Sequence, residues 1–106
     1  MERTDENFAR FQQTRRRTSY RAALNRISGL ADIWDNYRDS YRLVCVHIYA
    51  ADCHLMETID PEGETVFIMP DCHRDWIGND LFTVELILFE HFLSEGYSLD
   101  EPQIEL

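Results

Sequence analysis

The sequence predicts an α+β domain in the order helix, three strands, helix (αβββα). Two observations carry this prediction. β-branched and aromatic residues dominate three short runs between Tyr41 and Met69, as strands favour. The segments on either side repeat their apolar residues at helical spacing. We therefore expect one domain over residues 1–106, with an N-terminal helix or helices, a three-stranded antiparallel meander and a C-terminal helix, and with the helices packed on one face of the sheet.

The first forty residues have a helical pattern. Phe8 and Phe11 open it, and Gly29 lies inside it, where glycine costs ~1 kcal/mol relative to alanine. A bend or break at Gly29 would give two shorter helices. Apolar residues recur about every 3.5 positions from Tyr20 onward, at Ala23, Leu24, Ile27, Leu30, Ala31, Trp34, Tyr37 and Tyr41. Five arginines mostly occupy the complementary face: Arg15, Arg16, Arg17, Arg21 and Arg26.

The meander consists of strands near 41–50, 53–59 and 64–69. Pro61 and Gly63 favour a tight turn between the last two, because proline presets φ and glycine tolerates a positive φ. Alternation divides the first strand into two faces. Val44, Val46, Ile48 and Ala50 form the better core face, and Leu43, Cys45, His47 and Tyr49 form the other.

Residues 70–79 have breakers at both ends and indicate an ordered loop. Asn79 or Asp80 is a candidate N-cap for a final helix that runs to about Glu95 and stops at Gly96. A strand from Phe82 to Phe89 is the competing interpretation, but the length and the Glu-Gly ending favour helix. The predicted single core contains Ile27, Trp34, Val44, Val46, Ile48, Leu88 and Phe92.

Negative charge is the clearest global property. The net charge is −10, and all ten basic residues are arginine. Residues 1–42 hold nine arginines against six acids, whereas residues 43–106 hold Arg74 alone against fourteen acids. This asymmetry indicates either pairing between the two halves or a negative surface directed at a basic partner.

Several classes of protein are disfavoured. The run from Val84 to Leu93 is too short and too charged to cross a bilayer. The first six residues contain no apolar signal-peptide segment, so we expect a cytoplasmic protein without membrane contact. The chain has four glycines and no Gly-rich phosphate loop.

A repeated tripeptide raises the question of metal binding. Asp-Cys-His occurs at 52–54 and again at 71–73. Against zinc, the chain has no C-x-x-C pair, and adjacent residues on a strand point to opposite faces. We therefore predict no metal and no cofactor, with three reduced thiols, while metal binding remains an open alternative. Its candidate ligands are Cys45, Cys53, His54, Cys72 and His73.

A nucleophilic cysteine is the alternative that would make the chain an enzyme. Cys72 would attack, a nearby histidine would act as base, and Asp71 or Asp75 would orient it. No known motif surrounds the cysteine, so we predict a non-enzymatic protein. The candidate bases are His47, His54 and His91.

Nucleic-acid binding would use the arginine-rich N-terminal helix, centred on residues 15–17. The αβββα order resembles the double-stranded-RNA-binding domain in topology. That family uses basic residues at the start of its last helix. Here the corresponding stretch holds Asp71, Asp75 and Asp80 with Arg74 as its single basic residue.

The function expected from the sequence is that of an acidic inhibitor. It would occlude a basic surface, by its chemistry one that binds nucleic acid, on a nuclease or defence complex, as phage- or plasmid-type anti-defence proteins do. A toxin immunity protein is the alternative with the same chemistry. We expect a basic protein partner and no direct nucleic-acid contact, with a homodimer as a candidate state. The predicted contacts are Asp52, Glu57, Asp60, Glu62, Glu64, Asp71, Asp75 and Asp80.

Overall fold

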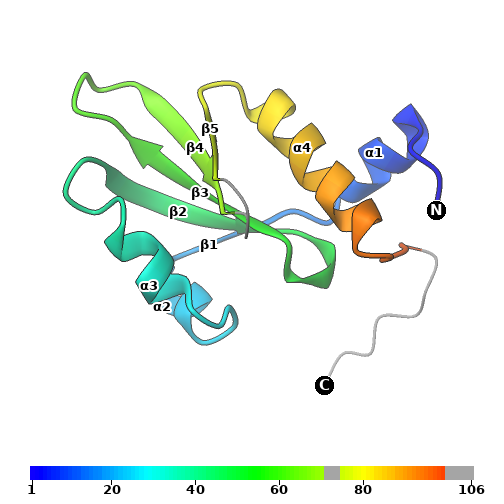
Figure 1. The fold of residues 1–106 in the computed structure, drawn as a ribbon, viewed down its shortest axis with the longest axis horizontal. Coiled ribbons are helices and arrows are strands. Elements are labelled where there is room, and N and C mark those ends of the chain that lie inside the picture. The colour runs from blue at the N-terminus through cyan, green and yellow to red at the C-terminus, as the bar shows by residue number, and fades with distance from the viewer. Residues whose placement is uncertain (71–74, 100–106) are drawn as a thin grey trace.

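The computed structural model describes residues 1–70 and 75–99. Its strands form one antiparallel sheet in chain order, β1-β2-β3-β4-β5, so each strand pairs with the next along the chain (Figure 1). The strands are β1 (Arg16–Thr18), β2 (Arg42–Ile48), β3 (His54–Ile59), β4 (Thr65–Met69) and β5 (Trp76–Gly78).

Four α-helices and one short 3-10 turn complete the described part of the chain. Helices α1 and α4 lie on one face of the sheet, and α2 and α3 lie on the other (Figure 1). Their bounds are α1 (Asp5–Gln12), α2 (Tyr20–Leu24), α3 (Leu30–Asp35), η1 (Ala50–Asp52) and α4 (Leu81–Ser94).

Hydroxyl caps and a glycine set the starts of the N-terminal helices. Thr4 Oγ1 accepts a hydrogen bond from the Asn7 amide, and Ser19 Oγ accepts one from the Ala22 amide, both at 3.1 Å. Each satisfies an N–H group that has no partner within its helix. Gly29 precedes α3 with a φ of 78°, which glycine adopts without steric cost. The chain therefore forms two short helices, α2 and α3, on either side of Gly29.

The sheet is covered on both faces, which gives the domain two cores. Strand β4 shows the consequence, because Val66 and Ile68 face one core while Phe67 and Met69 face the other. The α1/α4 core contains Phe8, Phe11, Tyr49, Cys53, Leu55, Phe67, Met69, Val84, Leu88, Phe89 and Phe92. The α2/α3 core contains Ala23, Ile27, Leu30, Trp34, Val46, Ile48, Met56, Val66 and Ile68.

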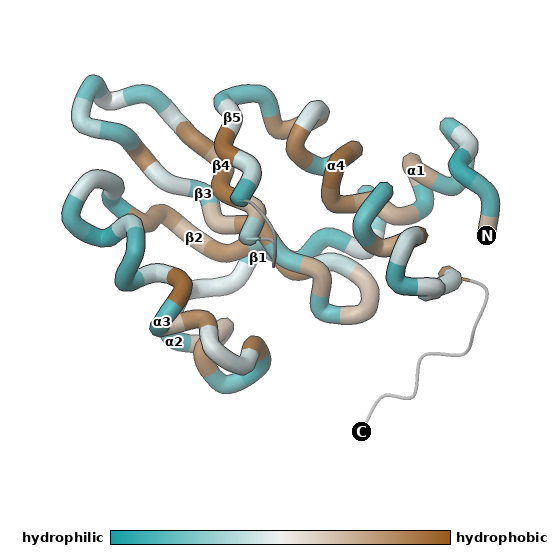
Figure 2. The backbone as a smooth tube through the Cα atoms, in the orientation of Figure 1, coloured by the Kyte–Doolittle hydropathy of each residue, from teal (hydrophilic) through white to brown (hydrophobic). Residues whose placement is uncertain are grey.

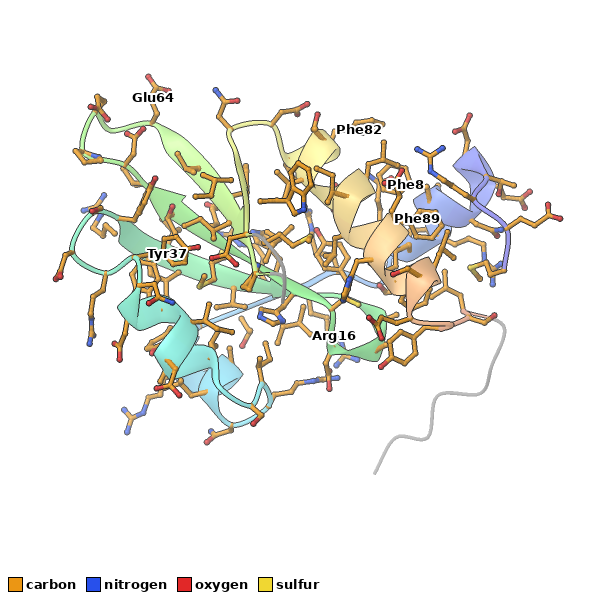
Figure 3. The ribbon with its side chains drawn as sticks, viewed as in Figure 1. Phe8, Arg16, Tyr37, Glu64, Phe82 and Phe89 are labelled. Carbon is orange, nitrogen blue, oxygen red and sulfur yellow. The ribbon has the colours of Figure 1, made fainter. Side chains whose placement is uncertain are left out.

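Hydropathy follows this layering. Hydrophobic residues concentrate on the central strands and α4, whereas the β3–β4 turn is hydrophilic (Figure 2). Aromatic rings join α1 to α4: Phe8 meets Phe82 edge-on at 5.3 Å and Phe89 at 5.6 Å between ring centroids (Figure 3). Phe11 stacks on Tyr49 at 5.0 Å. Such pairs add to the stabilisation from apolar burial.

The α+β class is confirmed, but the sheet has five strands among the described residues rather than three, and helices cover both faces rather than one. β1 lies within the first forty residues, for which the sequence predicted helix, and β5 lies where breakers predicted a loop. Both are three-residue strands at the sheet edges, stabilised by a neighbouring ladder rather than by their own pattern. The topological resemblance to the double-stranded-RNA-binding domain therefore does not hold.

A β-bulge in β2 corrects the predicted strand faces. Leu43 pairs with Thr58 and Cys45 pairs with Glu57, which leaves Val44 as the extra residue. Val44 is 43% exposed, although it was predicted in the core. Leu43 packs against the α2/α3 core, whereas Cys45 lies on the other face, because it directly precedes the α2/α3 core residue Val46 on the strand. On the N-terminal side of the bulge, side chains therefore point to the opposite face from the one that regular alternation predicts.

The remaining core prediction was right about burial and wrong about a single core. Ile27, Trp34, Val46 and Ile48 lie in the α2/α3 core, whereas Leu88 and Phe92 lie in the α1/α4 core.

The C-terminal helix agrees with the favoured prediction. Asp80 is its N-cap position, and Gly96 follows it with a φ of 82°. No helix within residues 1–70 and 75–99 is long and apolar enough to span a membrane. Residues 100–106 lie outside the described residues.

Candidate functional site

The β3–β4 turn holds three of the predicted contact residues. Asp60 Oδ1 accepts hydrogen bonds from the amides of Glu62 at 3.0 Å and Glu64 at 2.8 Å. Gly63 takes a φ of 85°. The Asp60 carboxylate therefore stabilises the turn, whereas the exposed side chains of Glu62 and Glu64 are directed to solvent.

Two further predicted contacts are occupied by partners within the chain. Asp52 Oδ1 accepts from Arg26 Nε at 2.6 Å, at the opposite end of β3 from the turn. Asp80 Oδ2 accepts from Thr83 Oγ1 at 2.6 Å in the first turn of α4. Asp75 is half-buried just before β5. Asp71, Cys72 and His73 lie outside the described residues, so the predicted nucleophile is not placed.

Glu57 belongs to a different environment from the other predicted acids. It lies within β3, directly across from Cys45 on β2. Residues paired across antiparallel strands share a face, and so do residues two apart on one strand. The side chains of Cys45, His47 and Glu57 therefore meet on the α1/α4 face of the sheet. Cys45 and His47 are buried, and the Glu57 side chain is 21% exposed.

The polar atoms of these three side chains converge on one point. His47 Nε2 lies 2.9 Å from Glu57 Oε1 and 3.6 Å from Cys45 Sγ. Cys45 Sγ lies 3.9 Å from Glu57 Oε1. We call these residues the Cys45–His47–Glu57 cluster. Within the part of the chain that the structure describes, it is the one group of three or more such side chains whose ligand atoms gather this closely.

Burial and neighbouring arginine side chains act on His47 within the cluster. Arg17 pairs with His47 across β1 and β2, and its Nε donates to Cys45 Sγ at 3.4 Å. This hydrogen bond raises the pKa of Arg17. Burial lowers the pKa of His47 below its ordinary value of 6.5, and the positive charges of Arg15 and Arg17 lower it further. The hydrogen bond and the negative charge of Glu57, which accepts from His47, oppose this shift. His47 is therefore neutral at pH 7.

The cluster does not have the geometry of a nucleophilic triad. In a triad, histidine turns one ring nitrogen to the nucleophile and the other to the acid. Here Nε2 faces both Cys45 and Glu57, while the buried Nδ1 has no hydrogen-bond partner among the described residues. The arrangement is suited to placing three ligand atoms around one point rather than to relaying a proton.

The first Asp-Cys-His tripeptide does not form a cluster. Cys53 is buried in the α1/α4 core, where burial raises the pKa of its thiol to about 11. His54 pairs with Ile48 in the ladder, and its Nδ1 lies 3.2 Å from the Asp52 carbonyl oxygen. The sequence alone does not identify Glu57 as the companion of Cys45 and His47, because their meeting depends on the register of β2 and β3.

A groove of about 400 Å³ lies beside the start of β2, on the α2/α3 side. Trp34 is almost fully buried, while Val44 exposes 43% of its surface. The groove is lined by Tyr20, Trp34, Arg38, Tyr41, Arg42, Leu43 and Val44. Aromatic and arginine side chains of this kind dominate the energetics of protein interfaces.

The predicted arginine-rich helix is absent. Helix α1 ends at Gln12, and Arg16 and Arg17 belong to the edge strand β1. Arg17 is hydrogen-bonded to Cys45, and Arg26 is paired with Asp52. The arginines therefore do not form one helical face. Comparison with protein-family models, curated proteins and solved structures finds no match for this chain.

Proposed function

We propose that this chain is a non-enzymatic binding protein that covers a basic surface on a nucleic-acid-handling protein. The proposal rests on one observation: at one end of the sheet, the acidic β3–β4 turn lies beside the groove lined by aromatic side chains. In the β3–β4 turn, Glu62 and Glu64 are exposed and have no ion-pair partner within residues 1–70 and 75–99. Figure 3 shows Glu64 at the outer edge of this end.

The turn and the groove are neighbours because of the β2–β3 register. Arg42, which lines the groove, pairs with Ile59, and Asp60 follows Ile59 at the start of the turn. The loop before β2 and the β3–β4 turn project from the same end of the sheet (Figure 1). A partner that contacts the turn therefore also reaches the groove.

Charge favours a basic partner at this end. The end of α3, the α3–β2 loop and the turn together carry five carboxylates, and the same end of the sheet carries two guanidinium groups. The acids are Asp35, Asp39, Asp60, Glu62 and Glu64, and the bases are Arg38 and Arg42. Arg38 is already paired with Asp35 at 2.9 Å. The net charge of −10 adds long-range attraction to a positive surface and repulsion from nucleic acid.

Large basic surfaces are typical of proteins that bind nucleic acid. The partner class that we propose is therefore a nuclease or a nucleic-acid-guided defence complex, with this chain as its inhibitor. Toxin immunity is a variant of the same proposal, since the contacts would be the same and the identity of the partner alone would differ.

The test compares two double variants of the full chain as baits in lysate of the native host. Glu62→Lys with Glu64→Lys reverses the turn, and Glu2→Lys with Glu95→Lys makes the same charge change elsewhere on the exposed surface. Asp60 stays unchanged because its carboxylate holds the turn. We expect the wild type and the control variant to recover the same nucleic-acid-binding protein from the lysate. The turn variant should not recover it.

Kinetics and competition then test occlusion on the purified partner. Its association rate with the wild type should fall steeply with salt, because attraction is screened over ~8 Å at physiological ionic strength, while the dissociation rate changes less. Excess wild-type protein should displace DNA or RNA from the partner. A stable ternary complex with nucleic acid still bound would refute occlusion, and equal loss of binding in both double variants would refute the role of the turn.

A further inference from the structure

We propose that the Cys45–His47–Glu57 cluster binds one transition-metal ion of the zinc class. This site lies on the α1/α4 face of the sheet, away from the β3–β4 turn, and does not depend on the proposed partner surface. It also departs from the expectation of no metal. That expectation rested on the missing C-x-x-C spacing, and these three residues come together through the fold and not through adjacency in the chain.

The distances between the ligand atoms approach those around a tetrahedral ion. With zinc bonds of about 2.3 Å to sulfur, 2.05 Å to nitrogen and 2.1 Å to oxygen, the atom pairs should lie about 3.6 Å (S–N), 3.6 Å (S–O) and 3.4 Å (N–O) apart. The observed separations are 3.6, 3.9 and 2.9 Å in the same order. The sulfur distances need a change of at most a few tenths of an ångström. The histidine–carboxylate pair must open by ~0.5 Å, which the partly exposed Glu57 side chain can supply.

The chemistry of the three donors selects the metal. Thiolate, imidazole and carboxylate together suit Zn²⁺ and Co²⁺, whereas Mg²⁺ and Ca²⁺ prefer oxygen donors alone. The Nε2 atom of His47 faces both other donors, at 2.9 Å from Glu57 Oε1 and 3.6 Å from Cys45 Sγ. Arg17 Nε donates a hydrogen bond to the Cys45 sulfur at 3.4 Å and so contacts this donor from the neighbouring strand β1.

The scaffold around the cluster is rigid, and one side is open. Cys45 and His47 lie on a strand that is paired on both sides, and the His47 ring meets Phe67 edge-on at 6.2 Å between centroids. Glu57 is the most exposed of the three ligands, so an ion would enter from its side. Three protein donors leave one tetrahedral position for water or a further donor.

The experiment is a titration of the full chain with Co²⁺ after removal of metal by a chelator. Co²⁺ reports its ligands directly, because a thiolate ligand gives a charge-transfer band in the near ultraviolet. We expect one Co²⁺ per chain, displaced by Zn²⁺ and unaffected by excess Mg²⁺. Cys45→Ser should abolish the band. Residues that merely orient ligands are worth about 10- to 100-fold in affinity, so His47→Gln and Glu57→Gln should each weaken binding at least about tenfold.

Matched variants of the same residue types serve as controls. Cys53→Ser, His91→Gln and Glu62→Gln change residues outside the cluster and should leave the band and the affinity unchanged. Loss of the band in Cys53→Ser but not in Cys45→Ser would overturn the assignment.

A measurement on the wild type covers the case in which Cys45→Ser does not fold. Under mild denaturation, Zn²⁺ should protect Cys45 from alkylation by iodoacetamide, with the modified residue identified by mass spectrometry. Cys53 should gain less protection than Cys45. Equal alkylation of Cys45 with and without Zn²⁺, or no stoichiometric Co²⁺ binding, would refute the metal site and leave the cluster as a hydrogen-bonded group.

Discussion

Tyr49 donates its hydroxyl to Glu85 Oε2 at 2.5 Å, inside the core between the sheet and α4. Gln12 Nε2 donates to the other carboxylate oxygen at 3.1 Å. Glu85 is 4% exposed. Its two hydrogen bonds link α4 to α1 and to Tyr49, the residue that follows β2. A carboxylate buried at this depth is costly unless donors satisfy it, which explains a glutamate on the buried face of an apolar helix.

Tyr49→Phe should destabilise the protein. Removing one donor to a buried charged group costs about 1.5–3 kcal/mol, because the Glu85 oxygen loses its partner and gains no solvent. Urea unfolding followed by circular dichroism measures this change. Tyr97→Phe is the control, since Tyr97 is exposed and keeps its ring against Phe92. Its effect should lie within about 0.5 kcal/mol, and equal effects of the two changes would contradict the role of the buried bond.

The buried and the exposed face of α4 can be compared by removing one aromatic ring from each. Phe92 is 1% exposed, so Phe92→Ala should cost about 3–5 kcal/mol through lost burial and a cavity. Phe82 is 57% exposed and contacts Phe8 edge-on, so Phe82→Ala should cost less than about 1.5 kcal/mol. Thermal unfolding of both variants measures the difference. Similar losses would mean that the helix is rotated from the observed position.

The bulge in β2 predicts opposite outcomes for two valines. Val46 is fully buried, so Val46→Thr places a hydroxyl among apolar side chains and should cost about 1–3 kcal/mol. Val44→Thr makes the same chemical change at an exposed position and should stay within about 0.5 kcal/mol. Denaturant midpoints decide between them. Similar losses at Val44 and Val46 would instead support the regular strand that the sequence predicted, with both valines on the core face.

Acid should weaken the fold through His47, which is buried, and His54, which is half-buried. Burial lowers the pKa of both His47 and His54 from the ordinary value of 6.5. Their contribution to stability is therefore fully present above about pH 6.5 and is lost as pH falls toward the lower folded values, because the unfolded chain takes up protons first.

The measurement for this prediction is the free energy of unfolding between pH 7 and about pH 5.5, a range in which most carboxylates remain charged. His54→Gln should make the decline with falling pH shallower than in the wild type. His91→Gln, on α4, serves as the control and leaves the contribution of His54 in place. A decline equally steep in His54→Gln and the wild type would contradict the prediction.

The candidate site shows which contacts between residues can be predicted from the sequence alone. The Asp-Cys-His tripeptide indicated a metal site because its residues are consecutive. Cys53 nevertheless lies in the α1/α4 core, whereas His54 pairs with Ile48 of the α2/α3 core, so the two side chains point to opposite faces. Cys45 and His47, two residues apart on a predicted strand, could be assigned to one face. Their meeting with Glu57 depends on the β2–β3 register beyond the Val44 bulge, and therefore on both strands at once.

Local chemistry determined the central meander, the break at Gly29, the turn closed by Asp60 and Gly63, and the final helix, because each follows from the preferences of a few neighbouring residues. The tertiary structure decided the edge strands, the division into two cores and the contacts of Asp52 and Glu57. A three-residue strand such as Arg16–Thr18 has no stability of its own and forms only against a completed neighbour. The facing of Val44 likewise depends on a bulge, since one extra residue reverses every side chain before it and no property of valine marks where that residue lies.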